Sequence, residues 1–293
     1  MVNKAGRGQP PGETSGETRA EYRAQTAQFW WRASGITDSC ASLYRASAAP
    51  PPGLHNRPIL SFSPTYPTVA VLSLALIVLL SYLLGAIPFS LVVARIRGVN
   101  LREHGSGNAG ATNALRVMGK GPGLAVFALD FAKGLVAVVL ISQIRVGGES
   151  LVGILGSRPD LADAWAATIA GASAMIGHVV TVWGRVFFES WKGGKGVATG
   201  AGMLAGLAPI PVTLAAVLFV AVVWATRYVS LGSILGAVSL PITLLALHFG
   251  LDVRNPPPVW IFAIVVPAFI VWTHRANVRR LLDGTESRFG SKA

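Results

Sequence analysis

Residues Val69–Ile96 read VAVLSLALIVLLSYLLGAIPFSLVVARI, an apolar run that carries no charge before Arg95. About 20 apolar residues are enough for a helix to cross the roughly 30 Å hydrocarbon core of a bilayer. The run is continuous, whereas the strands of a membrane barrel alternate apolar and polar side chains. This stretch therefore predicts a transmembrane helix.

Further apolar segments follow along the chain, and together they predict an all-α integral membrane protein with seven transmembrane helices. The seven segments are Val69–Ile96, Gly123–Ile144, Ala162–Trp183, Val197–Leu207, Val212–Thr226, Val229–Phe249 and Val259–Thr273. The composition agrees, because 52% of the residues are hydrophobic and 13% are charged, against about 25% charged in soluble proteins. The fourth segment is short and reaches about 17 Å, so we expect it to span half of the bilayer. Its small-residue spacing (Gly196/Gly200 and Gly202/Gly206) predicts close packing on neighbouring helices.

Composition divides the chain into two parts. Residues 1–66 are rich in Gly, Pro, Ser, Thr, Arg and Glu, which predicts a mostly disordered N-terminal extension. Residues 67–293 form the predicted membrane domain, which ends in a short C-terminal tail. The single cysteine, Cys40, excludes an internal disulfide framework and argues against a cysteine metal site, and we expect no metal.

Basic residues orient the predicted bundle. The net charge is +12, and Lys and Arg lie beside helix ends, which indicates topology signals and contacts with anionic lipid rather than nucleic-acid binding. Loops one, three and five and the C-terminal tail carry most of these cations. They are Arg97, Arg102, Arg116, Lys120, Arg185, Lys192, Lys195, Arg227, Arg275, Arg279, Arg280, Arg288 and Lys292. The positive-inside rule puts these loops and the C-terminus in the cytoplasm and the N-terminus outside.

The first glycine-rich loop, Glu103–Arg116, reads EHGSGNAGATNALR. It contains GxGxxG, but a dinucleotide fingerprint needs a preceding strand, and here a predicted transmembrane helix precedes it. Successive backbone N–H groups in such a turn form an anion-binding nest. The neutral donors beside the nest are Ser106, Asn108, Thr112 and Asn113, and Arg116 adds a positive charge. The alternative interpretation is a loop that only caps a helix.

The second glycine-rich loop, Trp191–Gly200, reads WKGGKGVATG. No Ser or Thr follows its Gly-Lys pairs, so it is not a P-loop. Gly193 and Gly194 allow a ligand to approach the backbone closely, and Lys195 supplies charge. The alternative is that the lysines extend toward lipid phosphates.

Several polar residues lie at or near the helix ends. Asp130 and Lys133 stand three residues apart, which favours an ion pair with a structural role. His178 ends the third segment, and a hydrogen-bonded structural histidine is the favoured interpretation. Ser230 lies in the connector RYVSLGS. His274 and Asn277 share one face of the helix that follows the last segment, surrounded by cations that could equally be a membrane anchor. The residues alone predict a cytosol-facing site for phosphate-like anions.

Four motifs occur in order: GSGNAGATNALR, GGKGVAT, RYVSLGS and HRANVRRLLDGTE. With these motifs the chain resembles the bacterial PlsY family over about residues 70 to 290. The resemblance implies a cofactor-free enzyme of the bacterial cell membrane that transfers a fatty acyl group from acyl phosphate to the 1-hydroxyl of sn-glycerol 3-phosphate. The products are lysophosphatidic acid and phosphate, in the first step of phospholipid synthesis. A soluble PlsX-type partner is implied as the source of acyl phosphate.

The resemblance also implies residue roles. It assigns the acyl phosphate to Ser106, Asn108, Thr112, Gly193, Gly194 and Lys195. It assigns glycerol 3-phosphate to Arg116, Lys195, Ser230, His274 and Asn277, with Asn113 as a further substrate-binding residue. Lys195, His274 and Ser106 are the predicted catalytic residues, and the general base is either the donor phosphate or His274.

The chain departs from the family pattern in one region. Thr181 stands where a proline is expected, and Gly184–Glu189 resembles an insertion before the second glycine-rich loop.

An alternative function is an organic-anion transporter, which would require polar groups near the bilayer midplane and usually a repeated architecture. A lipid-binding scaffold is a third possibility, but it would not need so many uncharged donors.

Overall fold

The computed structural model describes residues 67–290, and the regular structure in this part of the chain is helical. The predicted N-terminal extension, residues 1–66, lies outside the described residues. The α-helices are α3 (Pro67–Gly85), α4 (Phe89–Ile96), α5 (Ala111–Met118), α6 (Lys120–Val139), α7 (Pro159–Val179), α8 (Val182–Phe188), α9 (Val197–Leu207), α10 (Pro209–Thr226), α11 (Val229–Leu251), α12 (Pro257–Thr273) and α13 (Arg275–Leu282). Two 3-10 helices, η1 (Ile141–Gln143) and η2 (Val146–Gly148), lie between α6 and α7.

Four stretches of residues 67–290 are long and apolar enough to cross a membrane. They are Thr68–Ile96, Lys120–Gln143, Pro209–Thr226 and Val229–Leu251. A fifth is obtained if α12 and α13, which meet at 58°, are taken as one broken span, and α9 is a shorter apolar helix. α7 is 21 residues long but alanine- and glycine-rich, which lowers its hydropathy. Seven membrane crossings therefore stay a prediction.

Two predicted helices are interrupted. The first apolar segment breaks between Gly85 and Phe89, because Pro88 supplies no backbone N–H and disfavours helix at the residue before it. The third segment ends at Val179, and the expected insertion forms α8. The Thr181 hydroxyl caps α8 by accepting a hydrogen bond from the Gly184 N–H at 2.8 Å.

Small residues let the helices approach closely. α6 packs along α9, and α3 packs along α7. A Cβ on Gly202 of α9 would overlap the Phe131 carbonyl of α6, and a Cβ on Gly177 of α7 would overlap the Tyr82 carbonyl of α3. The predicted close packing of the short helix is thus confirmed, and it follows the small-residue rule for membrane helices.

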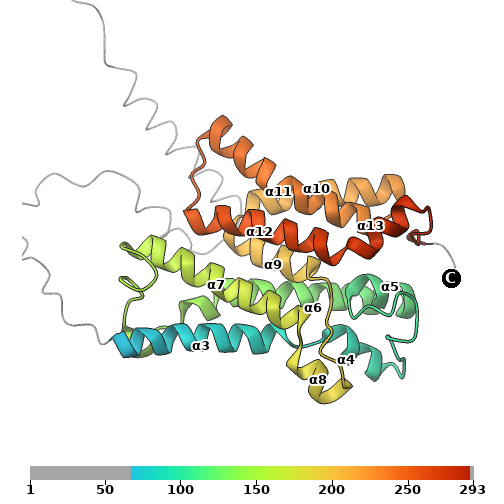
Figure 1. The fold of residues 1–293 in the computed structure, drawn as a ribbon, viewed down its shortest axis with the longest axis horizontal. Helices are drawn as coiled ribbons and strands as arrows, with labels where there is room; N and C mark the ends of the chain where they lie inside the picture. The colour runs from blue at the N-terminus through green and yellow to red at the C-terminus, as the bar shows by residue number, and fades with distance from the viewer. Residues whose placement is uncertain (1–66, 291–293) are drawn as a thin grey trace, which may run out of the picture. The chain divides into compact units, whose positions relative to one another are not determined.

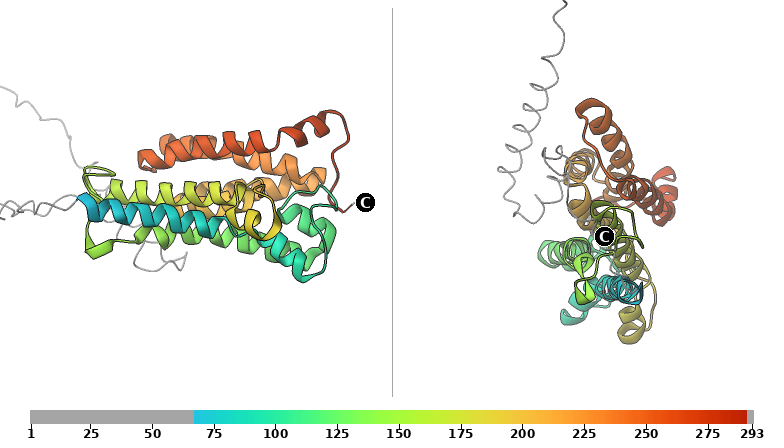
Figure 2. Two further views of the ribbon diagram at one scale, coloured as in Figure 1. Left: turned by 60° about the horizontal axis from the view of Figure 1, so that its bottom comes forward. Right: turned by 90° about the vertical axis from the view of Figure 1, so that its left-hand side faces the viewer.

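The helices lie roughly along one direction, so the connections gather at two ends (Figures 1 and 2). α4, α5, α8 and α13 lie at one end, together with both glycine-rich loops, whereas η1 and η2 lie at the other (Figure 1). Many large apolar side chains point outward between the ends, including Val217, Val220, Ile242 and Ile264. An apolar exterior of this extent suits a lipid environment.

Candidate active site

The first glycine-rich loop folds around the buried side chain of Asn113 on α5. The Asn113 Oδ1 accepts a hydrogen bond from the Ser106 N–H at 2.8 Å, and its Nδ2 donates to the carbonyls of Leu101 and His104, both at 3.1 Å. Gly105 has φ +63° and lies so close that a Cβ would overlap the Asn113 Oδ1. One amide therefore sets the curvature of the loop, and direct contact of Asn113 with a substrate stays a prediction.

The other donors predicted on this loop are open to a ligand. Ser106 and Thr112 are exposed and Asn108 is half-buried. Among residues 67–290 their side chains have no hydrogen-bond partner. Arg116 is also half-buried, and its charge acts on Lys195 of the second glycine-rich loop. The loop thus presents neutral donors and one nearby cation.

The second glycine-rich loop is held by its own backbone against the end of α7. The Gly193 N–H donates to the Val179 carbonyl at 2.8 Å, and the Gly194 N–H donates to the His178 carbonyl at 3.2 Å. A Cβ on Gly193 would overlap the His178 carbonyl, and a Cβ on Gly194 would overlap the His178 Nε2. Both glycines are needed for this close approach to the end of α7, whereas the approach of a ligand to their backbone stays a prediction.

The two loops touch each other. A Cβ on Gly194 would stand 2.8 Å from the carbonyl oxygen of Ala109, so the backbones of the two loops are in contact there. Arg102 of the first connection also donates from Nη2 to the Lys192 carbonyl at 2.8 Å. Sequence reasoning gave Arg102 only a topological role. Residues far apart in the sequence are thus brought to one place at one end of the bundle (Figure 1).

Lys195 connects the second loop to the C-terminal third of the chain. Its Nζ donates to Asn277 Oδ1 on α13. Asn277 Nδ2 donates to Glu286 Oε1 at 2.7 Å, and the Ser230 hydroxyl of α11 donates to the same oxygen at 2.8 Å. Three residues predicted from separate motifs, Lys195, Ser230 and Asn277, therefore belong to one hydrogen-bonded network.

Glu286 is the residue of this network that sequence reasoning did not single out. Besides the bonds from Asn277 and Ser230, its Oε2 accepts a hydrogen bond from Arg280 Nε at 2.7 Å. Burial alone would raise the pKa of Glu286, but these hydrogen bonds and the Arg280 charge lower it overall. The available signal was its place as the last letter of HRANVRRLLDGTE, an acid in a basic segment.

The environment of Lys195 is cationic and partly buried. Burial is the main cause that lowers the pKa of Lys195 to about 8, and the charges of Arg280, Lys192 and Arg116 lower it further, whereas Glu286 raises it. An anion bound here would relieve the repulsion among these cations. The arrangement therefore favours a phosphate-like ligand.

His274 is buried where α12 meets α13. Its Nδ1 lies 2.8 Å from the Ile270 carbonyl, so Nδ1 carries the proton and Nε2 is left as an acceptor. Burial, followed by the Lys195 charge, lowers the pKa of His274 to about 4, so the ring is neutral near pH 7. Thr273 Oγ1 shares its proton between the Ile270 carbonyl at 2.9 Å and the Lys195 carbonyl at 3.3 Å, so this helix junction lies against the second glycine-rich loop.

Asp130 and Lys133 form the predicted ion pair, with Oδ1 and Nζ 2.8 Å apart and both residues buried. His178 Nδ1 lies 3.7 Å from the same carboxylate oxygen. The structural pairing expected from the spacing of Asp130 and Lys133 is confirmed. His178 is also buried against the second glycine-rich loop, in line with its favoured interpretation.

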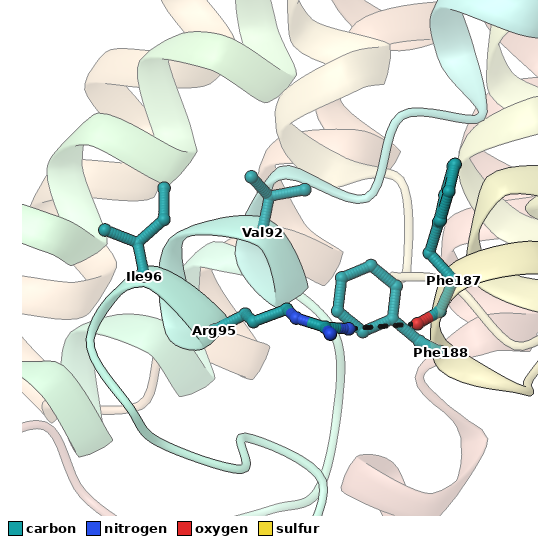
Figure 3. A pocket seen from close by; sticks show the side chains of 5 residues that line it. All are labelled: Val92, Arg95, Ile96, Phe187 and Phe188. Atoms are coloured by element: carbon teal, nitrogen blue, oxygen red, sulfur yellow. Dashed lines mark hydrogen bonds between the residues drawn. The ribbon is translucent and has the colours of Figure 1, made fainter.

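A separate surface pocket of about 270 Å³ lies between α4 and α8 (Figure 3). Its lining residues are Val92, Arg95, Ile96, Phe187 and Phe188. The Arg95 guanidinium donates to the Phe187 carbonyl at 3.3 Å and lies 5.8 Å from the centre of the Phe188 ring. None of the predicted site residues lines this pocket, so it is not the candidate active site.

Comparison with known proteins agrees with this geometry. A family model described as glycerol-3-phosphate acyltransferase matches residues 75–284. The glycerol-3-phosphate acyltransferase of Chlorobaculum parvum is 41% identical over 242 residues, which cover 76% of this chain and 100% of the relative. The crystal structure of PlsY, an integral membrane glycerol 3-phosphate acyltransferase, in its glycerol 3-phosphate form is 36% identical with a TM-score of 0.62, covering 74% of this chain and 96% of that one. The lysophosphatidic acid form of the same protein is 34% identical in sequence with a TM-score of 0.59, and the match covers 75% of this chain and 95% of that one.

Proposed function

Because the chain belongs to the PlsY family of integral membrane glycerol-3-phosphate acyltransferases, we propose that it uses acyl phosphate as its donor. In the proposed reaction a fatty acyl group passes to the 1-hydroxyl of sn-glycerol 3-phosphate. The products are 1-acyl-sn-glycerol 3-phosphate, which is lysophosphatidic acid, and inorganic phosphate. The alternative of an organic-anion transporter is not carried forward, because the family consists of acyltransferases.

One observation carries the proposal: Lys195 lies between two sets of groups suited to phosphate. On one side are the open hydroxyl and amide side chains of the first glycine-rich loop, whose backbone contacts Gly194. On the other are the Asn277 amide and the Arg280 guanidinium, which the Glu286 carboxylate joins. Two phosphorylated reactants need such a divided site, with a cation between them to offset their mutual repulsion.

The chemistry requires little from the protein beyond alignment and charge. An acyl phosphate is a mixed anhydride, so its carbonyl carbon is already activated. The 1-hydroxyl oxygen attacks that carbon, a new C–O ester bond forms, and the bond between the carbonyl carbon and the phosphate oxygen breaks. The hydroxyl proton goes to the departing phosphate or to His274 Nε2. Phosphate leaves with the bonding electron pair, stabilised by nearby N–H groups and the Lys195 charge.

We assign the donor to the side formed by Ser106, Asn108, Thr112, Gly193 and Gly194. The open hydroxyl and amide side chains of Ser106, Asn108 and Thr112 support this assignment, because the phosphate of a mixed anhydride carries several acceptor oxygens. The N–H groups of Gly193 and Gly194 bond to carbonyls at the end of α7, so these two glycines support it by placing the second loop beside those donors. Asn113 supports the same side indirectly through its bonds to the loop.

We assign glycerol 3-phosphate to Arg116, Ser230, His274 and Asn277, with Lys195 shared between the two substrates. Two contacts of Lys195 support this division. Its Nζ donates to Asn277 Oδ1, and its carbonyl lies within hydrogen-bond distance of Thr273 Oγ1. The uncharged His274 Nε2 offers an acceptor for a substrate hydroxyl.

The proposed membrane arrangement has seven crossings, with α9 spanning half of the bilayer and the glycine-rich loops and C-terminus in the cytoplasm. The basic residues of those loops support this sidedness. A membrane-impermeant thiol reagent tests it in a Cys40→Ser background. Glu103→Cys should react only after the cells are opened, whereas Glu149→Cys should react in intact cells. The reverse pattern would overturn the arrangement.

A turnover assay tests the reaction. The purified protein would receive palmitoyl phosphate and glycerol 3-phosphate, and lysophosphatidic acid and phosphate would be followed together. We expect equal amounts of the two products, and we expect no product from palmitoyl-CoA in a parallel reaction. A soluble PlsX-type synthase would supply the donor in the cell, so adding one with its own substrates should replace added palmitoyl phosphate. Absence of product above a boiled control would refute the proposed function.

A further inference from the structure

Three buried polar residues beneath the second glycine-rich loop are not used by the chemistry proposed above. Asp130 and Lys133 on α6 are each 2% exposed, and His178 at the end of α7 is 7% exposed. Ionisable groups are costly to bury in a membrane protein unless they are paired, and they are commonly functional there. The contacts of these three residues therefore need an explanation beyond the packing of two helices.

Lys133 fixes one end of the cluster to the break between α3 and α4. Its Nζ donates to the Ile87 carbonyl at 2.9 Å and lies 5.5 Å from the centre of the Phe89 ring. The neighbouring Ala86 carbonyl accepts a hydrogen bond from the Thr181 hydroxyl. Carbonyls left without helical partners by the break are thus satisfied from α6 and from the start of α8.

Asp130 links Lys133 to His178. Its Oδ1 lies 2.8 Å from Lys133 Nζ and 3.7 Å from His178 Nδ1. The same oxygen is buried and makes no hydrogen bond of regular geometry with a described residue, so its interaction with these two nitrogens is mainly electrostatic. A single carboxylate oxygen therefore lies beside both nitrogen groups.

His178 transmits this arrangement to the second glycine-rich loop in two ways. Its carbonyl accepts the Gly194 N–H at 3.2 Å, and its ring lies so close to Gly194 that a Cβ there would overlap Nε2. The next residue along the chain is Lys195, and the same Cβ on Gly194 would also stand 2.8 Å from the Ala109 carbonyl of the first loop. The His178 ring thus lies between Asp130 of α6 and Gly194, and it limits how closely the second loop approaches α6.

We propose that Asp130, Lys133 and His178 are positioning residues, which fix the height of the second glycine-rich loop so that Lys195 is aligned with the reacting phosphate. The inference rests on the proposed function for its catalytic consequence. Its structural content, the position of the loop relative to α6, can be tested without turnover. A displacement of about 1 Å at a reacting group can lower a rate about 100-fold.

The main variant is Asp130→Asn, which keeps the volume of the side chain and removes its charge. We expect kcat to fall about 100-fold. The KM for glycerol 3-phosphate should change less than kcat, because Lys195 is the one proposed contact of this substrate that the second loop carries. The matched control is Asp163→Asn, near the start of α7 and far from His178 at its end, which removes the carboxylate that pairs with Arg145. This control should leave kcat within twofold of the wild type.

A distance measurement tests the structural part separately. Spin labels at Lys120→Cys on α6 and Lys192→Cys on the second loop, in a Cys40→Ser background, report the loop position by pulsed electron resonance. Asp130→Asn should broaden or shift the distance distribution, and Asp163→Asn should leave it unchanged. If the wild type itself makes no lysophosphatidic acid, the proposed function fails, and this measurement alone decides the positioning role.

A double variant separates positioning from simple charge balance. Asp130→Asn combined with Lys133→Gln leaves no unpaired charge and covers the case in which the single variant fails to fold. We expect the double variant to keep the broadened distances and the low kcat. Recovery of both wild-type kcat and the narrow distribution would overturn the proposal, because charge balance alone would then be enough. Wild-type behaviour of Asp130→Asn would overturn it equally.

Discussion

The two glycine-rich loops lie against each other, yet they are held in opposite ways. The first curls around the Asn113 amide and leaves its hydroxyl and amide side chains open. The second is fixed by its own N–H groups to the carbonyls of His178 and Val179, and it carries Lys195, whose ammonium group bonds to Asn277. The shape of the first loop thus depends on the Asn113 side chain. The position of the second loop depends on the absence of a Cβ at Gly193 and Gly194.

This difference indicates a division of labour. The first loop offers neutral donors, which can bind an anion's oxygens at little cost in charge repulsion. The second loop brings Lys195 into a cationic and partly buried place, where an ammonium group acts strongly on a phosphate. Substitutions of Lys195, Gly194 and Asn113 should therefore differ in the size of their effect and in the kinetic constant that they change.

The largest effect is expected from Lys195→Ala. Loss of a charge that touches the transferring phosphate should lower kcat/KM roughly 100- to 1,000-fold, by analogy with the removal of one oxyanion-stabilising group. Lys120→Ala is the matched control, because Lys120 is an exposed lysine at the first residue of α6. Steady-state phosphate release measures both variants. A Lys195→Ala enzyme with wild-type kcat/KM would remove the charge from the mechanism.

Gly194→Ala should follow with a loss of about 100-fold in kcat. The added methyl would meet the His178 ring and the Ala109 carbonyl, so the second loop must move away from both. Overpacking of this kind also costs roughly 1–3 kcal/mol of stability. Gly121→Ala on α6 is the control, since a Cβ there meets nothing within 4 Å. Equal activity of the two alanine variants would contradict the close approach of the loops.

Asn113→Ala should lower kcat/KM for the acyl donor about 10- to 30-fold, because the first loop loses the amide that shapes it. Three backbone groups lose a hydrogen-bond partner, at a cost of roughly 2–4 kcal/mol in unfolding free energy. Asn100→Ala, which removes an exposed hydrogen bond to Glu103 near the same loop, should change both quantities little. Thermal unfolding and donor titration check the pair. An unaffected Asn113→Ala enzyme would show that another group holds the loop.

The smallest effect concerns pH. The Lys195 pKa is lowered to about 8, so the ammonium form prevails below that pH and is lost above it. The kcat/KM for glycerol 3-phosphate should therefore fall about twofold at pH 8 and about tenfold at pH 9 relative to its plateau. In Lys195→Arg the guanidinium stays charged, so whatever activity remains should not show this decline. A decline that persists in the arginine variant would belong to another group.

Sequence reasoning was most successful where local signals are strong. The short helix was predicted as Val197–Leu207 and has those bounds, because Gly196 with φ +83° precedes it and Pro209 begins the next helix. The Asp130–Lys133 pair followed from helical spacing alone. The motifs also identified Lys195, Ser230 and Asn277, which the fold brings together.

The missed features depend on contacts between distant segments. The break before Phe89 is tolerated because Lys133 and Thr181 bind the exposed carbonyls, and neither partner can be inferred from the apolar run itself. Glu286 gains its role only when α11 and α13 bring Ser230 and Asn277 beside it. The residues expected to be an insertion lie mostly in α8, whose first turn is capped by the Thr181 hydroxyl. A single threonine is a weak sequence signal for the start of a helix.

The bond from Arg102 to the Lys192 carbonyl, together with the contact of Gly194 with Ala109, has a consequence for how each substrate affects the binding of the other. A ligand that restricts the motion of one loop also restricts the other, and it thereby lowers the entropy cost of the second binding event. Thermodynamic linkage makes this advantage reciprocal. On the proposed function, each phosphorylated substrate should tighten the binding of the other by the same factor, whichever of them arrives first.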